Sequence, residues 1–254
     1  MHQPCGEPAG SPIERPATTD PPPTAGAAGL GRPPAAAGRI FGDRLSHAEA
    51  YAELLATDGV ARGLVGPREV SRLWDRHLLN CAVVAELIPA GSGVVDVGSG
   101  AGLPGIPLAL ARPDLSVTLL EPSLRRSDFL IEVLARLGLS TVVVHRRRAE
   151  EGAPAPAAVV TARAVAPLQQ LVAWCLPWVA AGGRLLAIKG DTAPAEVAAS
   201  TAAVRSAGGQ PAALRRCGVG VVDPPTTVVE IARAPAAGSV RGIAAGSRLQ
   251  HRRG

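Results

Sequence analysis

Short apolar runs alternate with helical stretches from Gly93 onward, and this alternation constrains the fold more than any other feature of the chain. Strands that alternate with helices form a parallel sheet with helices on both faces. The expected parallel strands are VVDVG at 94–98, VTLLE at 117–121, TVVVH at 141–145, AVVTARA at 158–164 and RLLAIKG at 184–190. Two last strands, near 213–222 and 226–233, have no helix between them and predict an antiparallel hairpin at the sheet edge. The sequence therefore predicts an α/β, Rossmann-like fold with a seven-stranded, mostly parallel sheet.

Composition divides the chain into four segments. They are a leader at 1–38, N-terminal helices at 39–92, the main domain at 93–234 and a tail at 235–254. The leader holds nine of the 24 prolines and few large apolar side chains, so it cannot bury enough surface to offset chain entropy and is expected to be disordered. The tail carries four arginines and no acid, which predicts a basic disordered segment. Between leader and main domain, two helices are expected over about 44–57 and 67–88.

Several classes of protein are excluded by composition. The six aromatic residues are too few for a platform of stacked rings that binds single-stranded nucleic acid, so any grip on RNA must come mainly from arginine. The four cysteines form no C-x-x-C pair, which argues against a zinc site or a disulfide framework and favours a reducing compartment. No apolar run reaches the roughly 18 residues of a membrane span, and the first ten residues do not resemble a signal peptide. We expect a cytoplasmic monomer without metal or membrane contact.

A glycine-rich loop, DVGSGAG at 96–102, follows the first expected strand and leads into a helix. This order places the loop at the carboxyl edge of the sheet, where ligands bind in open α/β folds. Gly100, Gly102 and Gly105 also satisfy the G-x-G-x-x-G register of dinucleotide-binding proteins, which is a weak signal when it stands alone. An NAD-dependent oxidoreductase is therefore an open alternative.

Two carboxylates near this loop bear on the choice of ligand. Asp96 stands two residues before the first glycine, where it complements a cationic ligand and would repel a pyrophosphate. Glu121 ends the next strand, 21 residues after Gly100, at a spacing where an acid binds ribose hydroxyls. S-adenosylmethionine carries an ammonium and a sulfonium and no phosphate, so it is the favoured cofactor. The candidate cofactor residues of this region are Asp96, Gly98, Gly100, Gly102 and Glu121.

The catalytic motifs that the chain lacks reduce the number of possible methyl acceptors. Methyltransferases that act on adenine or cytosine amines usually carry an Asp/Asn-Pro-Pro-aromatic run after the fourth strand, where this chain has TARAV at 161–165. The DPPT run at 223–226 lies beyond the fifth strand and lacks the aromatic residue, so it is interpreted as a turn. Pyrimidine C5 methylation needs a cysteine nucleophile, and Cys81 and Cys175 stand in apolar helical patterns typical of a core. Guanine N7 remains suitable, because it has a free lone pair and loses no proton on methylation.

Five sequence stretches resemble the RsmG (GidB) family of ribosomal RNA small subunit methyltransferases. They are RHLLN at 76–80, VDVGSGAGLPGIP at 95–107, LE at 120–121, RA at 163–164 and AIKG at 187–190. The long glycine-rich run is the specific part, and the resemblance extends over roughly residues 40–233, with Asn80 where many relatives have Asp. It implies a class I methyltransferase fold, S-adenosylmethionine as methyl donor, and N7 methylation of guanine(527) in the 16S rRNA of the small ribosomal subunit.

The resemblance also assigns residues to the cofactor. Gly98 and Leu103 would contact it at the glycine loop, and Glu121 would hold the ribose. Ala149 and Glu150, after the third strand, would border the adenine. Arg163 would lie beside both the cofactor and the base pocket, so it is the first candidate for a catalytic role, mainly in positioning, with no general base expected.

Candidate RNA contacts come from three places in the sequence. Arg72 and Arg76 lie four residues apart on the second expected helix and share a face, so they either meet phosphates or pair with Glu69 and Asp75. His77 follows them and is favoured as a packed core histidine over a substrate contact.

The other two places adjoin expected strand ends. Arg125 and Arg126 open a helix beside the second strand. Lys189, the only lysine of the chain, ends the fifth strand and is a second candidate catalytic and RNA-binding residue. Besides the oxidoreductase, a non-catalytic RNA-binding factor for ribosome assembly is an open alternative, because the tail is basic and catalytic groups are sparse.

Overall fold

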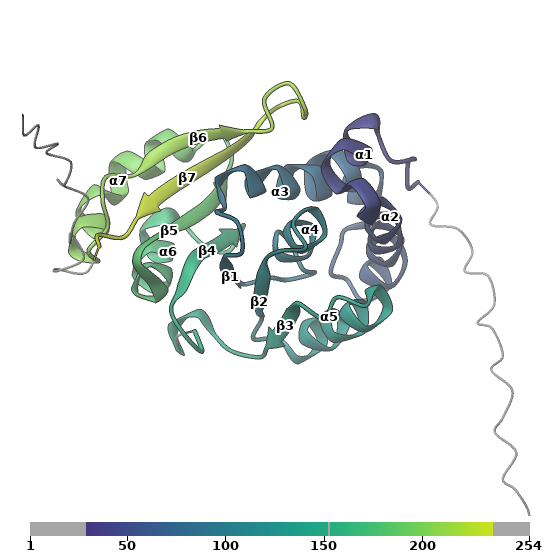
Figure 1. Ribbon diagram of the computed structural model, residues 1–254, viewed down its shortest axis with the longest axis horizontal. Helices are drawn as coiled ribbons and strands as arrows, with labels where there is room; N and C mark the ends of the chain where they lie inside the picture. Colours follow the sequence, from purple (N-terminus) through teal and green to yellow (C-terminus); the bar gives the residue numbers. More distant parts are fainter. Residues whose placement is uncertain (1–28, 152, 236–254) are drawn as a thin grey trace, which may run out of the picture.

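The computed structural model describes residues 29–151 and 153–235 (Figure 1). Helix α1 (Ala35–Phe41) begins before residue 38, where the sequence predicts the end of the leader. That boundary is wrong because Ala36 and Ala37 pack their small methyl groups into the core, a burial that a count of large apolar side chains does not detect. Residues 1–28 of the expected leader, and all but the first residue of the expected tail, lie outside the described residues.

Seven strands form one sheet in the order β3-β2-β1-β4-β5-β7-β6. Their bounds are β1 (Gly93–Val97), β2 (Ser116–Leu120), β3 (Val142–His145), β4 (Ala157–Arg163), β5 (Val179–Lys189), β6 (Ala213–Cys217) and β7 (Thr226–Ala232). β1 to β5 pair in parallel, and β7 runs antiparallel to both β5 and β6. The predicted sheet and its edge hairpin are confirmed. Chain order reverses at β1, between β2 and β4, and such reversal points form ligand crevices.

Helices cover both faces of the sheet (Figure 1). α4 (Gly105–Ala111) and α5 (Leu124–Leu137) share one apolar core with the N-terminal helices. α6 (Leu168–Cys175) and α7 (Ala193–Ser206) belong to a second core. Successive strand residues point to opposite faces, so the valines of β1 divide between the two cores. Among the described helices, none combines the length and the apolar character needed to cross a bilayer.

The segment before β1 is helical but irregular. α2 (Leu45–Leu54) continues into a π-helical turn at Leu55–Gly59. The region predicted as one helix over 67–88 consists of a 3-10 helix at Pro67–Arg72, a π-helical stretch at Leu73–Leu79, α3 (Asn80–Ala82) and a 3-10 helix at Val83–Leu87. Helix is therefore present where the sequence predicts it, but its hydrogen-bonding pattern changes three times. π-Helical turns are frequent at functional sites.

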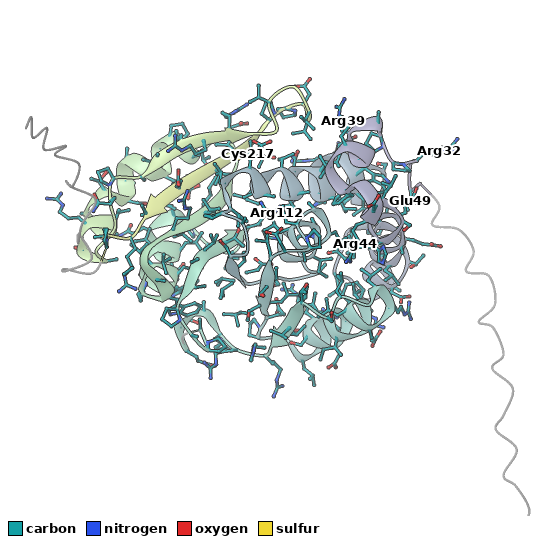
Figure 2. All side chains as sticks on the ribbon, in the orientation of Figure 1. Arg32, Arg39, Arg44, Glu49, Arg112 and Cys217 are labelled. Atoms are coloured by element: carbon teal, nitrogen blue, oxygen red, sulfur yellow. The ribbon has the colours of Figure 1, made fainter. Side chains whose placement is uncertain are left out.

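Side-chain hydrogen bonds join this N-terminal segment to the rest of the fold, among them one to the loop after β1 and one from the end of α4. Tyr51 of α2 is fully buried, and its hydroxyl donates to the carbonyl of Ala101 at 2.8 Å. Arg112, at the end of α4 (Figure 2), donates from Nη1 to the carbonyl of Ile88 at 3.1 Å. The N-terminal helices are thus part of the same folded unit as the sheet, and one of them reaches the glycine loop.

Candidate active site

The loop after β1 has a backbone that requires glycine. Gly98, Gly100 and Gly102 have φ values of 68°, 58° and 103°, in the region that L side chains rarely adopt. A Cβ at Gly98 would lie 2.7 Å from Cγ2 of Val165, and one at Gly102 would lie 2.9 Å from the Tyr51 hydroxyl. The loop therefore presents bare backbone at the carboxyl end of β1, where a ligand can approach it closely.

Asp96 lies beneath this loop and is completely buried. Its Oδ2 accepts a hydrogen bond from the backbone N–H of Gly105, the first residue of α4, at 3.0 Å. Its Oδ1 is also buried and has no hydrogen-bond partner. Burial raises the pKa of Asp96 to about 7, and the Gly105 hydrogen bond opposes that rise. Asp96 does not line the cavity at the carboxyl ends of β1 and β4, so the carboxylate could act on a bound cation only through the loop and at a distance.

Glu121 connects the loops that follow β1 and β2. Its Oε2 accepts from the N–H of Gly100 at 2.9 Å, and its Oε1 accepts from the N–H of Ser123 at 3.0 Å. The side chain is only 2% exposed, and Nη1 of Arg126 lies 3.9 Å from Oε1. The predicted neighbourhood of Glu121 and the glycine loop is therefore present, with both carboxylate oxygens already accepting backbone hydrogen bonds.

A cavity of about 300 Å³ opens at the carboxyl ends of β1 and β4. Its wall combines the glycine loop, the residues after β4 and part of the N-terminal segment. The charged or titratable side chains that line it are Glu69, His77, Arg126 and Arg163. Of the predicted site residues, the cavity brings together Gly98, Gly100, Leu103, His77, Arg126 and Arg163.

Three of these side chains form a continuous hydrogen-bonded chain. Nη2 of Arg163 lies 2.8 Å from Nδ1 of His77, and Nε2 of His77 lies 2.9 Å from Oε2 of Glu69. Arg163 also donates to Sγ of Cys81 at 3.1 Å and to the carbonyl of Arg76 at 3.1 Å. The favoured interpretation of His77 as a core histidine is wrong, because its side chain is 18% exposed and lines the cavity.

The charge states of His77 and Glu69 follow from burial and hydrogen bonding. Burial lowers the pKa of His77, and the hydrogen bond to Glu69 opposes that shift. The same hydrogen bond lowers the pKa of Glu69. At neutral pH we therefore expect a neutral imidazole between a carboxylate and a guanidinium.

The sequence profile of the family described as "GidB: rRNA small subunit methyltransferase G" matches residues 44–221. The chain belongs to the GidB family. A relative from Salinispora tropica named "Ribosomal RNA small subunit methyltransferase G" is 62% identical over 206 residues, which cover 78% of this chain and 85% of that protein. A relative of the same name from Streptomyces coelicolor is 57% identical over 204 residues, covering 80% and 85% respectively. The resemblance described from sequence motifs is confirmed.

Solved structures give the fold of this GidB-family chain. Mitomycin 7-O-methyltransferase MmcR superposes with a TM-score of 0.54 at 20% identity, covering 77% of this chain and 68% of that one. The S-adenosylmethionine-dependent methyltransferase SibL superposes with a TM-score of 0.53 at 18% identity, covering 77% and 70%. The fold is the class I, Rossmann-like methyltransferase fold, as predicted.

Lys189 is the predicted catalytic residue that the structure does not bring to the cavity. Its ammonium donates to the carbonyl of Ala166 and to Oε2 of Glu196, both at 2.8 Å. The same Glu196 oxygen accepts from the N–H of Leu168, the first residue of α6, at 2.8 Å. The side chain of Lys189 is 11% exposed. It fixes the junction of β5, α6 and α7, so its placement supports neither catalysis nor RNA contact.

Other predicted residues of the GidB-family chain also lie outside the cavity wall. Ala149 and Glu150 belong to a 3-10 turn after β3, and Ala149 packs partly against the second core. Arg125 is exposed near the start of α5. Arg72 lies 3.7 Å from Glu69, as the pairing alternative predicts, whereas Arg76 contributes its carbonyl to Arg163 and extends an exposed side chain.

Three residues at the site were not predicted to belong to it. Tyr51 holds the glycine loop, Cys81 contacts Arg163, and Glu69 was considered only as an ion-pair partner of Arg72. Glu69 stands eight residues before His77, about two helical turns, a spacing that indicates a shared face. Within residues 29–151 and 153–235, no three His, Cys, Asp or Glu side chains are grouped as a metal site would need.

Proposed function

We propose that the protein transfers a methyl group from S-adenosylmethionine to N7 of a guanine, guanine(527), in the 16S rRNA of the small ribosomal subunit. Membership of the GidB family supports the rRNA small subunit as substrate, because the relatives with 52–62% identity carry that name.

The residues at the carboxyl end of β1 fit S-adenosylmethionine. The bare backbone at Gly98 and Gly100 admits a ligand, and Leu103 adds an apolar contact. A buried carboxylate with one unpartnered oxygen, Asp96, lies under the loop and favours positive charge above it. When bound, S-adenosylmethionine supplies an electrophilic methyl group on a sulfonium. We also propose that Ala149 and Glu150 border its adenine and that Glu121 shares its oxygens with the ribose.

A dinucleotide fits the same loop less well. In dinucleotide-binding proteins the pyrophosphate binds at the N-terminus of the helix that follows the glycine loop. Here the N–H of Gly105, at the start of that helix, already donates to the Asp96 carboxylate at 3.0 Å. A pyrophosphate at this place would lie next to that carboxylate and close to Glu121, so the oxidoreductase is the weaker alternative.

The observation that carries the choice of N7 is the state of His77. Nδ1 accepts from Arg163 and Nε2 donates to Glu69, so neither ring nitrogen is available to remove a proton from a substrate. Methylation of an exocyclic amine requires loss of a proton, whereas methylation of guanine N7 does not. Alignment of N7 with the methyl group is then the main catalytic contribution, and Arg163 is the side chain best placed to orient the base.

Arginines around the cavity supply the contacts that we propose for the rRNA backbone. Arg126 lines the cavity on one side, and Arg125 is exposed beside it. Arg72 and Arg76 are exposed on the opposite, N-terminal side, next to Glu69 and His77. Phosphate contacts from such positions fix the position of an RNA without reading its sequence.

The test uses small ribosomal subunits from cells that lack the modification. We expect methyl-labelled S-adenosylmethionine to label the 16S rRNA, and cleavage at N7-methylguanine to give one break, at guanine 527. Arg163→Ala should lose most of the label, and Arg205→Ala, an exposed arginine of α7, should retain it.

Each contrary result identifies a different error. Label without cleavage would mean another target atom, and cleavage elsewhere would mean another guanine. Binding to the subunit without any label would favour the assembly factor. Calorimetric binding of NAD, with none of S-adenosylmethionine, would favour the oxidoreductase.

A further inference from the structure

The hydrogen-bonded chain at the cavity wall fixes the tautomer of His77. A guanidinium carries only donors, so Nδ1 of His77 must accept from Nη2 of Arg163, 2.8 Å away. The proton of the neutral ring is then on Nε2, which faces a carboxylate oxygen of Glu69 at 2.9 Å. The alternative tautomer would place an Nδ1–H against the guanidinium N–H groups and leave Nε2 and the carboxylate as two facing acceptors. Glu69 therefore stabilises the form of His77 that binds Arg163, and the guanidinium favours the same form.

We infer that Glu69 and His77 are positioning residues for Arg163, with Glu69 setting the ring tautomer and His77 holding the guanidinium at the cavity wall. The inference rests on the proposed function only in taking Arg163 as the residue that orients the guanine. The tautomer itself follows from contacts within the chain.

The other contacts of Arg163 show why its hydrogen bond to His77 matters. Its guanidinium also donates to the thiol of Cys81 and to the carbonyl of Arg76, so these three acceptors come from the segment that precedes β1. Arg163 itself ends β4, and Ala164 next to it has a φ of 55°. A non-glycine residue rarely adopts this backbone conformation, because its Cβ is crowded there. The guanidinium thus joins two distant parts of the chain at a strained turn, where loss of one acceptor permits it to move.

The charged groups around the imidazole act in opposite directions. Glu69 favours the protonated ring, whereas Arg163 and Arg76 disfavour it. Protonation at Nδ1 would remove the acceptor for Arg163 and place two cations in contact. We therefore expect methyl transfer to decline at acid pH as His77 becomes protonated, and the tautomer to be well defined above neutral pH.

The test compares Glu69→Gln with Glu69→Ala in the full chain. Gln keeps an acceptor oxygen for Nε2–H, and Ala does not. Nitrogen NMR of 15N-histidine-labelled protein at pH 7.5, with the His77 signals assigned by their loss in His77→Gln, should show the Nε2–H form in the wild type and in Glu69→Gln. In Glu69→Ala we expect a mixture of tautomers. Asp75→Ala, which removes an exposed carboxylate from the same helical stretch, should leave the spectrum unchanged.

Kinetics on small subunits provide the second measurement. Misplacement of the guanidinium in Glu69→Ala should lower kcat by about 10- to 100-fold with little change in KM for S-adenosylmethionine, and Glu69→Gln should recover most of kcat. A wild-type ring protonated on Nδ1, or a Glu69→Ala protein with unchanged tautomer and unchanged kcat, would overturn the inference. If the wild type labels no rRNA, the proposed function fails, and the NMR comparison still decides whether Glu69 sets the tautomer.

Discussion

Asp96→Asn tests the electrostatics beneath the glycine loop. Burial raises the pKa of Asp96 from 3.8 to about 7 in the folded protein. Between these two pH values the folded state binds more protons than the unfolded state, so the free energy of unfolding falls as the pH rises. Each pKa unit corresponds to about 1.4 kcal/mol, so ionised Asp96 destabilises the fold by roughly 4 kcal/mol above pH 7. From pH 5 to pH 7, about two units are crossed, and the loss is about 3 kcal/mol.

The variant cannot ionise, although its amide oxygen can still accept from Gly105. Urea denaturation of both proteins at pH 5 and pH 8 gives two differences in unfolding free energy. We expect the difference to move by about 3 kcal/mol in favour of the variant at pH 8. Comparison with the wild type cancels every other group that titrates over this range.

Thr161→Val is the matched control for this measurement. Thr161 pairs with Asp96 across β1 and β4, and its buried hydroxyl also has no partner, but it carries no ionisable group. Its effect on stability should be the same at both pH values. An Asp96→Asn difference that is equally constant would refute the claim that burial of this carboxylate controls its ionisation.

Three further substitutions test single contacts. Gly98→Ala places a side chain where φ is 68°, and should weaken S-adenosylmethionine binding in calorimetry by about tenfold or more, since roughly 1–3 kcal/mol of strain falls on the loop; unchanged affinity would contradict this. Tyr51→Phe removes the hydrogen bond to Ala101 and should lower the free energy of unfolding by about 1–2 kcal/mol in urea, and an equally stable variant would show that the contact is dispensable. Lys189→Met leaves Glu196 without its ammonium and should cost about 1–3 kcal/mol of stability; a stable variant with reduced kcat would instead restore Lys189 as a catalytic candidate.

The sheet was predictable because its signals are local. Alternating apolar runs, the glycine loop and the missing helix before β7 are each contained within a few residues, and all agree with the observed strand order. The acid at the end of β2 was found for the same reason, since its spacing from the loop is fixed by one helix and one strand. In each case the pattern lies within one short, continuous stretch of the sequence.

The Glu69–His77–Arg163 chain was not predictable in the same way. It joins side chains 86 and eight residues apart in the sequence, and it depends on a π-helical stretch that apolar periodicity does not distinguish from an α-helix. Lys189 shows the opposite case. Its position at the end of β5 was predicted correctly, but its partner Glu196 lies in the following helix, and the pairing takes the ammonium away from the cavity.

The shared core of the N-terminal helices and the sheet limits how this protein can be engineered. A fragment that begins at Gly93 would keep every described strand and the glycine loop. It would lack the N-terminal helices that cover one apolar core, and it would lack the Tyr51 hydrogen bond to the loop. Such a fragment would expose a large apolar surface to water and would aggregate. A fusion or insertion is better placed before α1 or after β7 than at residues 92–93, where composition predicts the boundary between the N-terminal helices and the main domain.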